Sequence, residues 1–327
     1  MRSFFSLNSS DEIIQQIPTE CNKLILIPHR YLHLLPLHGL PLAGDSNLFE
    51  RFPGGVSYAP SCQLLQLTQN RQRPEFTHLF AIQNPTGDLC YSDIEVETIQ
   101  SYFNTSNLLK HKIATKKAID DTSLTAVHCA HFSCHGYFNG TEPRKSALLL
   151  ADSQLNYAPT QPDTENYLSL ENGGVLDLNK CLSLDSIFTL NLEQCRLVTL
   201  SACETGLIDF RNTSDEYIGV PSGFLYAGAS SVVSSLWKVN DLSTAFLMIR
   251  FYQNIQKCWT VALALNQAQI WLKDITKKEL QVWIVENQFH IDATLSMSLR
   301  RRLNKMSDND KPFELPFHWA ASCAIGQ

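Results

Sequence analysis

The chain has 327 residues, 44% of them hydrophobic and 18% charged, and a net charge of -6, a composition typical of a globular protein with one large domain or two. The acidic balance excludes the basic surface of a nucleic-acid-binding protein, and no apolar run reaches the roughly 20 residues of a membrane span. Ten scattered cysteines, with no secretory signal at the N-terminus, predict free thiols in the cytoplasm rather than disulfides.

Strand and helix patterns alternate along the chain. Short apolar runs rich in β-branched and aromatic residues predict strands, and longer runs with apolar residues at helical spacing predict helices. The predicted strands lie within residues 23–42, 78–83, 124–134, 197–203 and 229–237, and the predicted helices at 92–103, 243–255 and 260–272. This alternation predicts an α/β protein with a largely parallel sheet covered by helices on both faces.

Local signals predict how three segments between these elements behave. Ser92, with Glu95 three residues later, has the pattern of a helix N-cap with its capping box. The polar residues 150–174, punctuated by Pro and Gly, predict an exposed loop or hairpin. The basic run at residues 299–305 predicts a solvated helix face.

Residues 126–138, AVHCAHFSCHGYF, hold five potential metal ligands, namely His128, Cys129, His131, Cys134 and His135. A structural zinc site usually draws its ligands as two close pairs, but the chain has no CxxC. The segment has the composition of a strand, in which neighbours alternate between faces, so the five side chains do not converge on one ion. We therefore expect no metal here and no cofactor, and we expect His131 to be a hydrogen-bonded core residue.

Two residues stand where predicted strands end. His135 follows one strand and precedes Gly136, and Cys203 follows another and precedes Glu204. Active groups of parallel sheets gather outside the carboxyl ends of the strands, so an imidazole and a thiol can meet at one edge. The histidine can activate the thiol as a nucleophile, and backbone N–H groups in the turns at Gly136 and Cys203 can bind the developing oxyanion. Buried cysteines are nonetheless common and usually inert.

Several blocks of the sequence resemble the CHAT family of caspase-like peptidases, which are related to separase, caspases, legumain and the gingipains. The motifs that carry the resemblance are HFSCHGYF (131–138), LVTLSACETGL (197–207), the segment 223–252 around SSVVSSLWKVND, and FHWAASCAIG (317–326). Upstream, residues 24–40, 54–65 and 82–99 also resemble the family. The resemblance therefore extends over nearly the whole chain.

The resemblance implies a three-layer α/β/α sandwich with a mostly parallel sheet. We divide it into a non-catalytic, pseudo-protease-like half at residues 1–104 and a catalytic half at residues 105–327. It also implies a His135–Cys203 dyad and an oxyanion hole from the amides of Gly136 and Cys203. Cys134 stands where the family more often has Thr or Ser. In addition, the glycine-rich run that usually follows the nucleophile motif is missing, so we expect a loop near the site to have a different shape.

The substrate pocket is predicted from acids near the nucleophile. Glu204 follows Cys203 directly, and Asp241 follows a predicted strand, where it is either a helix N-terminal charge or a specificity residue. Trp237 either fills the core or lines the pocket. A carboxylate in the pocket favours a basic P1 side chain, with Asp241 ahead of Glu204.

The leading prediction is a cytoplasmic cysteine endopeptidase that acts in bacterial signalling. We expect its activity to be latent until a partner or an upstream tetratricopeptide-repeat region triggers it. Its partners would be a protein or peptide substrate and that repeat region, with no nucleic acid and no membrane span. The alternative is a catalytically silent CHAT-fold scaffold that acts as an interaction module.

Overall fold

A computed structural model gives the structure of the protein and describes residues 14–42, 46–120, 122–139, 141–155, 166–169, 174–201, 219–289, 291 and 293–327. Its centre is an eight-stranded sheet of order β1-β2-β14-β13-β12-β5-β3-β4. In that order the strands are Leu24–Leu26, Val56–Tyr58, Ser322–Gly326, Ser231–Ser235, Leu197–Ser201, Cys129–Ser133, His78–Gln83 and Thr105–Lys110.

All neighbouring strands of this sheet are parallel except one pair. β13 and β14 run antiparallel, with Ser231 opposite Gly326 and Ser235 opposite Ser322. The sheet therefore consists of two parallel blocks, β1-β2-β14 and β13-β12-β5-β3-β4, that run in opposite directions. The mostly parallel α/β/α sandwich expected from the sequence is confirmed.

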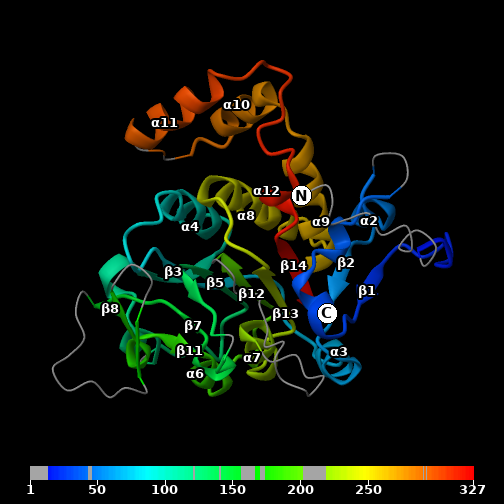
Figure 1. Ribbon diagram of the computed structural model, residues 1–327. Coiled ribbons are helices and arrows are strands. Elements are labelled where there is room, and N and C mark those ends of the chain that lie inside the picture. The colour runs from blue at the N-terminus through cyan, green and yellow to red at the C-terminus, as the bar shows by residue number, and fades with distance from the viewer. Residues whose placement is uncertain are drawn as a thin grey trace.

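Helices cover both faces of the sheet, as Figure 1 shows. One layer holds α2, α4, α8, α9 and α12, and the other holds α3, α5, α6 and α7. In chain order the helices are α2 (Leu48–Arg51), α3 (Cys62–Gln69), α4 (Ser92–Gln100), α5 (Lys116–Asp120), α6 (Leu184–Phe188), α7 (Val220–Tyr226), α8 (Asp241–Ile255), α9 (Val261–Asp274), α10 (Lys277–Glu286), α11 (Ala293–Leu303) and α12 (Pro316–Trp319).

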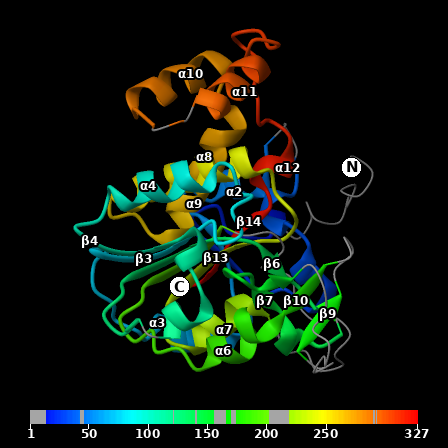
Figure 2. The same cartoon turned by 90° about the vertical axis from the view of Figure 1, so that its left-hand side faces the viewer.

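The segment between β5 and β12 forms two small antiparallel sheets beside the main one (Figure 2). One has the order β8-β10-β9 and the other β11-β7-β6. Within residues 150–174, where the sequence predicts an exposed loop or hairpin, the described part holds two short strands, and both pair with β10 just after this range. The strands are β8 (Gln154–Leu155), β10 (Val175–Asp177), β9 (Tyr167–Ser169), β11 (Leu182–Ser183), β7 (Ala147–Leu148) and β6 (Gly136–Tyr137).

The expected division of the chain at residue 104 stays a prediction. That position lies between β3 and β4, which pair along their whole length, from His78 opposite Thr105 to Gln83 opposite Lys110. The strands before and after it belong to one continuous sheet.

β5 is buried on both faces, and its two faces differ in chemistry. Ala130 and Phe132 pack into the apolar layer beneath the sheet. Cys129, His131 and Ser133 point to the other layer, where polar groups of α4 and α8 meet them. His131, predicted as a core residue, is fully buried, and this prediction is confirmed.

A buried contact between a histidine and a carboxyl group joins β5 to α4. His131 Nε2 lies 3.0 Å from Glu95 Oε1, and the two side chains are 0% and 2% exposed. On the other ring nitrogen, His131 Nδ1 lies 3.3 Å from the Tyr252 hydroxyl, which donates a hydrogen bond of 2.9 Å to Thr199 Oγ1. The network links α4, α8, β5 and β12 through polar groups that have no access to water.

The N-cap expected at Ser92 is wrong by one residue. Tyr91 occupies the N-cap position and makes no side-chain capping bond, and Ser92 is the first helical residue. The Ser92 hydroxyl donates instead to Ser133 Oγ on β5, at 2.7 Å, and Glu95 pairs with His131. Both members of the expected capping box are used for contacts between layers, which local spacing does not reveal.

We predict that Glu95→Ala lowers the free energy of unfolding by about 1–3 kcal/mol, because it leaves the buried His131 imidazole without its polar partner. Glu97→Ala is the matched control on the same helix, since Glu97 pairs with Lys110 at 3.0 Å with both side chains exposed, and such pairs contribute about 0–1 kcal/mol. Denaturant unfolding of the two variants measures the difference. Equal, small losses would show that the buried pair contributes no more than the exposed one.

Candidate active site

The ends of two neighbouring strands define the candidate site. β5 and β12 pair in parallel over five residues, with Ser133 opposite Ser201 at their carboxyl ends. His135 stands two residues beyond Ser133 and is partly exposed at this edge. Cys203 stands two residues beyond Ser201 in the sequence, but Cys203 and Glu204 lie outside the described residues.

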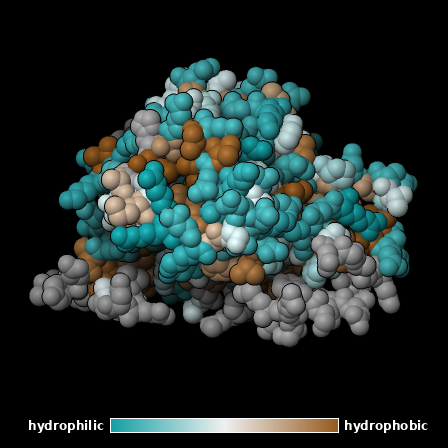
Figure 3. Space-filling view, turned by 90° about the horizontal axis from the view of Figure 1, so that it is seen from above, coloured by the Kyte–Doolittle hydropathy of each residue, from teal (hydrophilic) through white to brown (hydrophobic). Residues whose placement is uncertain are grey.

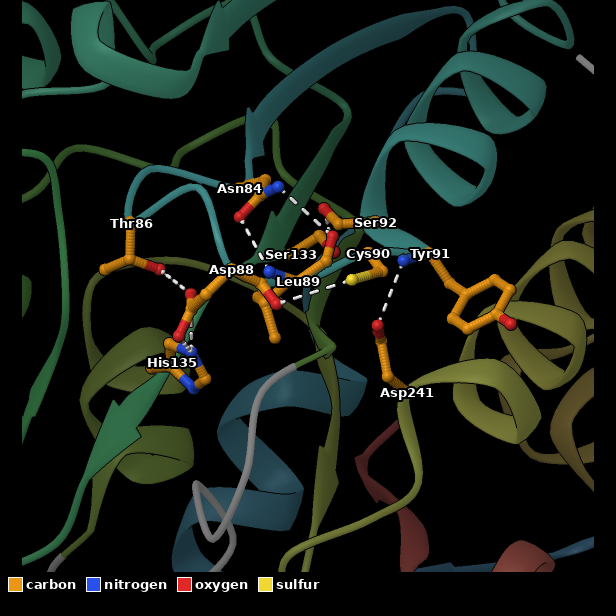
Figure 4. A network of polar contacts seen from close by, with 10 residues as sticks. All are labelled: Asn84, Thr86, Asp88, Leu89, Cys90, Tyr91, Ser92, Ser133, His135 and Asp241. Carbon is orange, nitrogen blue, oxygen red and sulfur yellow. Dashed lines mark hydrogen bonds and ion pairs between the residues drawn. The ribbon is translucent and has the colours of Figure 1, made fainter. Parts of the chain in front are cut away.

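His135 binds a carboxylate that the sequence analysis missed. Its Nε2 lies 2.9 Å from Oδ1 and 3.0 Å from Oδ2 of Asp88 (Figure 4). The histidine side chain is 26% exposed and that of Asp88 63%, so the pair lies at the surface. Burial raises the pKa of Asp88, but the Thr86 hydroxyl and His135 act in the opposite direction and hold that pKa below its ordinary value.

The loop after β3 carries Asp88 to this position. Asn84 accepts a hydrogen bond from the Leu89 amide through Oδ1 and donates one to the Leu89 carbonyl through Nδ2, both at 3.1 Å. The backbone N–H of Asn84 donates a hydrogen bond of 2.9 Å to the Ser133 carbonyl, and this bond links the loop to the end of β5. Asn84 has φ 46, a left-handed conformation that asparagine adopts more readily than most residues.

A sequence signal for Asp88 existed. It lies in the turn NPTGD that follows the predicted strand at 78–83, so the rule that drew attention to His135 and Cys203 applies to it as well. What the sequence does not give is the strand order, in which β3 lies directly beside β5.

Asp241 joins the N-termini of two helices. It is the first residue of α8, and its Oδ2 accepts a hydrogen bond of 2.9 Å from the Tyr91 amide at the start of α4. Burial raises the pKa of Asp241 to about 6; the Tyr91 hydrogen bond lowers it, and the Glu95 charge raises it further. His135 and Asp88 are also close enough to influence this pKa. Asp241 is therefore a helix N-terminal charge that lies near His135.

Trp237 lies in the segment between β13 and α8. It is half-buried, packs against both core layers, and donates a hydrogen bond of 3.2 Å from Nε1 to the Phe317 carbonyl. Its role in a substrate pocket, like that of Asp241, stays a prediction.

The Gly136 N–H is not bonded to the neighbouring strand β7. The Leu149 amide donates to the His135 carbonyl at 2.8 Å, and the next pair along the ladder is Gly136 opposite Leu148. Because hydrogen-bonded and non-hydrogen-bonded pairs alternate between antiparallel strands, the Gly136 N–H points away from β7. β6 is the edge of its sheet, so this N–H points out of that sheet.

The five-residue cluster at 128–135 spreads over different surroundings. Cys129 and His131 lie in the layer of α4 and α8, and Cys134 is buried in the opposite core. Within the described part of the chain, no three His, Cys, Asp or Glu side chains are grouped as a metal site. Over the same residues, no helix has the length and apolar character needed to cross a bilayer.

Comparison with known proteins identifies the fold. A family model for the CHAT domain matches residues 9–327, and no curated protein matches the sequence. Among solved structures, the chain is similar to gingipain R, described as an Arg-specific cysteine proteinase, with 10% identity, a TM-score of 0.51 and coverage of 97% of this chain and 65% of that one. The complex of RgpB pro- and mature domains from Porphyromonas gingivalis matches with 10% identity, a TM-score of 0.51 and coverage of 97% and 67%.

The separase–securin complex of Saccharomyces cerevisiae also matches, with 16% identity and a TM-score of 0.49. The comparison covers 90% of this chain but only 15% of the separase chain. The chain thus spans a small part of that protein and about two thirds of gingipain R.

We predict that Asp241→Asn makes the protein more stable at pH 8 and leaves its stability nearly unchanged below pH 4. Folding raises the pKa of Asp241 from 3.8 to about 6, so the folded chain holds the proton more tightly than the unfolded chain. The resulting stability is complete below about pH 4 and is lost as the pH rises through 6. The amide keeps an acceptor for the Tyr91 N–H and has no charge to bury, so the gain at pH 8 is about 1–3 kcal/mol.

Chemical denaturation at several pH values between 4 and 8 measures this difference. A gain that is the same at both ends of the range would mean that the Asp241 carboxyl titrates alike in the folded and unfolded chains.

Proposed function

The chain belongs to the CHAT domain family, and from that premise we propose that it is a cysteine endopeptidase in which Cys203 is the nucleophile and His135 the general base. The observation that carries this proposal is the register of β5 and β12, with Ser133 opposite Ser201. Neighbouring strands lie about 4.8 Å apart. His135 and Cys203 each follow their strand by two positions in the sequence, so the register supports a contact between the imidazole and the thiol.

Asp88 completes the arrangement by orienting the base. As an acceptor on Nε2, the carboxylate favours the tautomer with the proton on Nε2 and leaves Nδ1 free to take the proton of the thiol. The imidazolium that forms is stabilised by the same carboxylate. A thiolate paired with it attacks the substrate carbonyl, and the imidazolium then protonates the leaving amine.

The developing oxyanion would be bound by the Gly136 amide, which points away from its sheet partner, and by the Cys203 amide. Both donors would be backbone groups close to strand ends, with Gly136 as the first residue of β6. They would therefore be held by the hydrogen bonds of the sheet rather than by flexible side chains.

For the substrate we propose a basic P1 residue, recognised by the Asp241 carboxylate with Trp237 and Glu204 as further members of the pocket. One Asp241 oxygen is used by the Tyr91 amide, and the other can accept a bond from an arginine or lysine side chain. Burial makes the charged form of this carboxyl costly, so a cation bound beside it is favoured.

We further propose that the enzyme acts in the cytoplasm and is latent until a protein partner, such as a tetratricopeptide-repeat region, triggers it. The alternative, a silent scaffold with the same fold, differs in one measurable way, since only the peptidase reacts with a thiol-directed acyloxymethyl ketone probe at Cys203.

We predict that Cys203→Ala and His135→Ala each reduce peptide cleavage by a factor on the order of 10⁴ or more, because the two groups act as a unit. Asp88→Asn retains the dyad but loses the orienting charge, and we expect a fall of about tenfold to a hundredfold in kcat. Asp93→Asn, a nearby carboxylate that accepts a bond from Gln83 and does not contact His135, is the control and should retain activity. Cleavage by Cys203→Ala at the wild-type rate would exclude this nucleophile.

A cleavage profile against a peptide library tests the P1 proposal. We expect arginine or lysine at P1, and Asp241→Ala should lower kcat/KM for these substrates by about tenfold, or about 1.4 kcal/mol. An acidic or apolar P1 preference, or an unchanged rate in the variant, would remove Asp241 from the pocket.

A further inference from the structure

The helical hairpin of α10 and α11 extends beyond the three layers. Figures 1 and 2 both show the two helices at the top of the molecule, above α4 and α8. Seen from above, this side of the protein is mainly hydrophilic, with a few hydrophobic residues between the polar ones (Figure 3). The hairpin is thus a protruding element, and its exposed side chains include the hydrophobic residues Val282, Val285 and Met297.

α11 is amphipathic, and one of its exposed sides is basic. Leu299 and Leu303 are buried in the core beneath it. Arg301 and Arg302 are exposed in the last turn of α11, and Lys305 is exposed in the turn that follows the helix. We call these three residues the basic stripe. Arg300, in the same turn, is also exposed.

The basic stripe has no acidic partner among the described residues. The nearby acids have other contacts, since Asp308 pairs with Lys277 at 2.9 Å and Asp274 with Lys311 at 2.8 Å. Arg302 lies over the Phe313 ring, 5.5 Å from its centroid, and remains exposed. In a chain with a net charge of -6, this is a local positive surface whose charges are not neutralised within the hairpin.

A chain of contacts connects the basic stripe to the candidate active site. Phe313, beneath Arg302, contacts the His318 ring edge to face at 5.3 Å. His318 Nδ1 lies 3.0 Å from the hydroxyl of Ser243, in the first turn of α8 beside Asp241.

Tyr91, whose amide binds Asp241, gives a second connection. Burial raises the pKa of its phenol, whereas the Arg302 charge and the Ser298 side chain act in the opposite direction. The basic stripe therefore lies near the point where α4 and α8 begin.

We propose that the basic stripe is a docking site for an acidic segment of the polypeptide that is processed at the neighbouring site. Cleavage of the docked polypeptide rests on the proposed function, whereas its docking does not. Met297, 55% exposed and one turn before Arg301, offers an apolar contact at the end of the stripe. A partner with a few carboxylates and an apolar residue fits this surface.

Charge favours a polypeptide over a nucleic acid. The stripe has three cations, and the adjoining site carries the carboxylates of Asp88 and Asp241, which repel a continuous phosphate backbone. A protein segment can place its carboxylates on the stripe and other residues beside the acids. Electrostatic docking of this kind mainly increases the association rate and is weakened by salt.

The test measures binding separately from cleavage. The full chain with Cys203→Ala is titrated into a short fluorescein-labelled peptide rich in glutamate with one leucine, and fluorescence anisotropy gives Kd. We expect binding that weakens with added salt and falls by about tenfold when Arg301→Glu and Lys305→Glu are combined. Lys112→Glu combined with Lys117→Glu is the control, because it reverses two exposed charges outside the hairpin, and it should bind nearly as the parent does.

Three results would overturn the proposal: no binding of the peptide, an equal loss of binding in the control variant, or tighter binding of a labelled single-stranded RNA of the same length. Circular dichroism of each variant shows whether the fold is intact, and the substituted side chains are all exposed. Peptide binding by a wild-type chain whose Cys203 does not react with the acyloxymethyl ketone probe would count against the peptidase and leave the basic stripe in place. Cleavage by a chain that does not bind the peptide would refute the docking site and leave the peptidase in place.

Discussion

The parallel pairing of β5 with β3 on one side and β12 on the other is the constraint on which the site depends. β5 is hydrogen-bonded along both edges and buried on both faces, so it cannot slip by one residue without turning Phe132 into the polar layer and His131 into the apolar one. The register of the three strands is thereby fixed. The segments that follow the carboxyl ends of β3, β5 and β12 therefore begin at fixed positions relative to one another.

The polar face of β5 adds a second fixed relation. Along this face, His131 meets Glu95, Ser133 meets Ser92, and His135, just beyond the strand, meets Asp88. All three partners belong to one stretch of chain, the loop after β3 and the first turns of α4. Buried polar pairs of this kind are costly to break and add specificity only when every member is satisfied. The stretch is therefore held at several points, and the exposed His135–Asp88 contact lies at the end of a buried series.

The sequence predicts the parts of this arrangement that depend on local pattern. The alternation of strands and helices, the two faces of β5 and the placement of His135 at a strand end all follow from periodicity, and the structure has them. The sequence does not single out Asp88, because the contact of Asp88 with His135 depends on which strands are neighbours in the sheet. The Ser92 cap was wrong for a similar reason, since the spacing of Ser92 and Glu95 suits a capping box, while the packing of α4 on β5 uses both side chains elsewhere. Residues 202–218, which include Cys203, remain known from the sequence alone.

The antiparallel junction between β13 and β14 has a consequence for how the chain folds during synthesis. β1 and β2 come early in the chain, yet they reach the rest of the sheet through β14, where Tyr58 lies opposite Ile325. When these two strands leave the ribosome, their partner is still more than two hundred and fifty residues away. The block from β3 to β13 can assemble first, while β2 keeps an open edge with unpaired amides and carbonyls. Closing so long a loop is slow, and a chaperone that shields that edge would protect the nascent chain from aggregation.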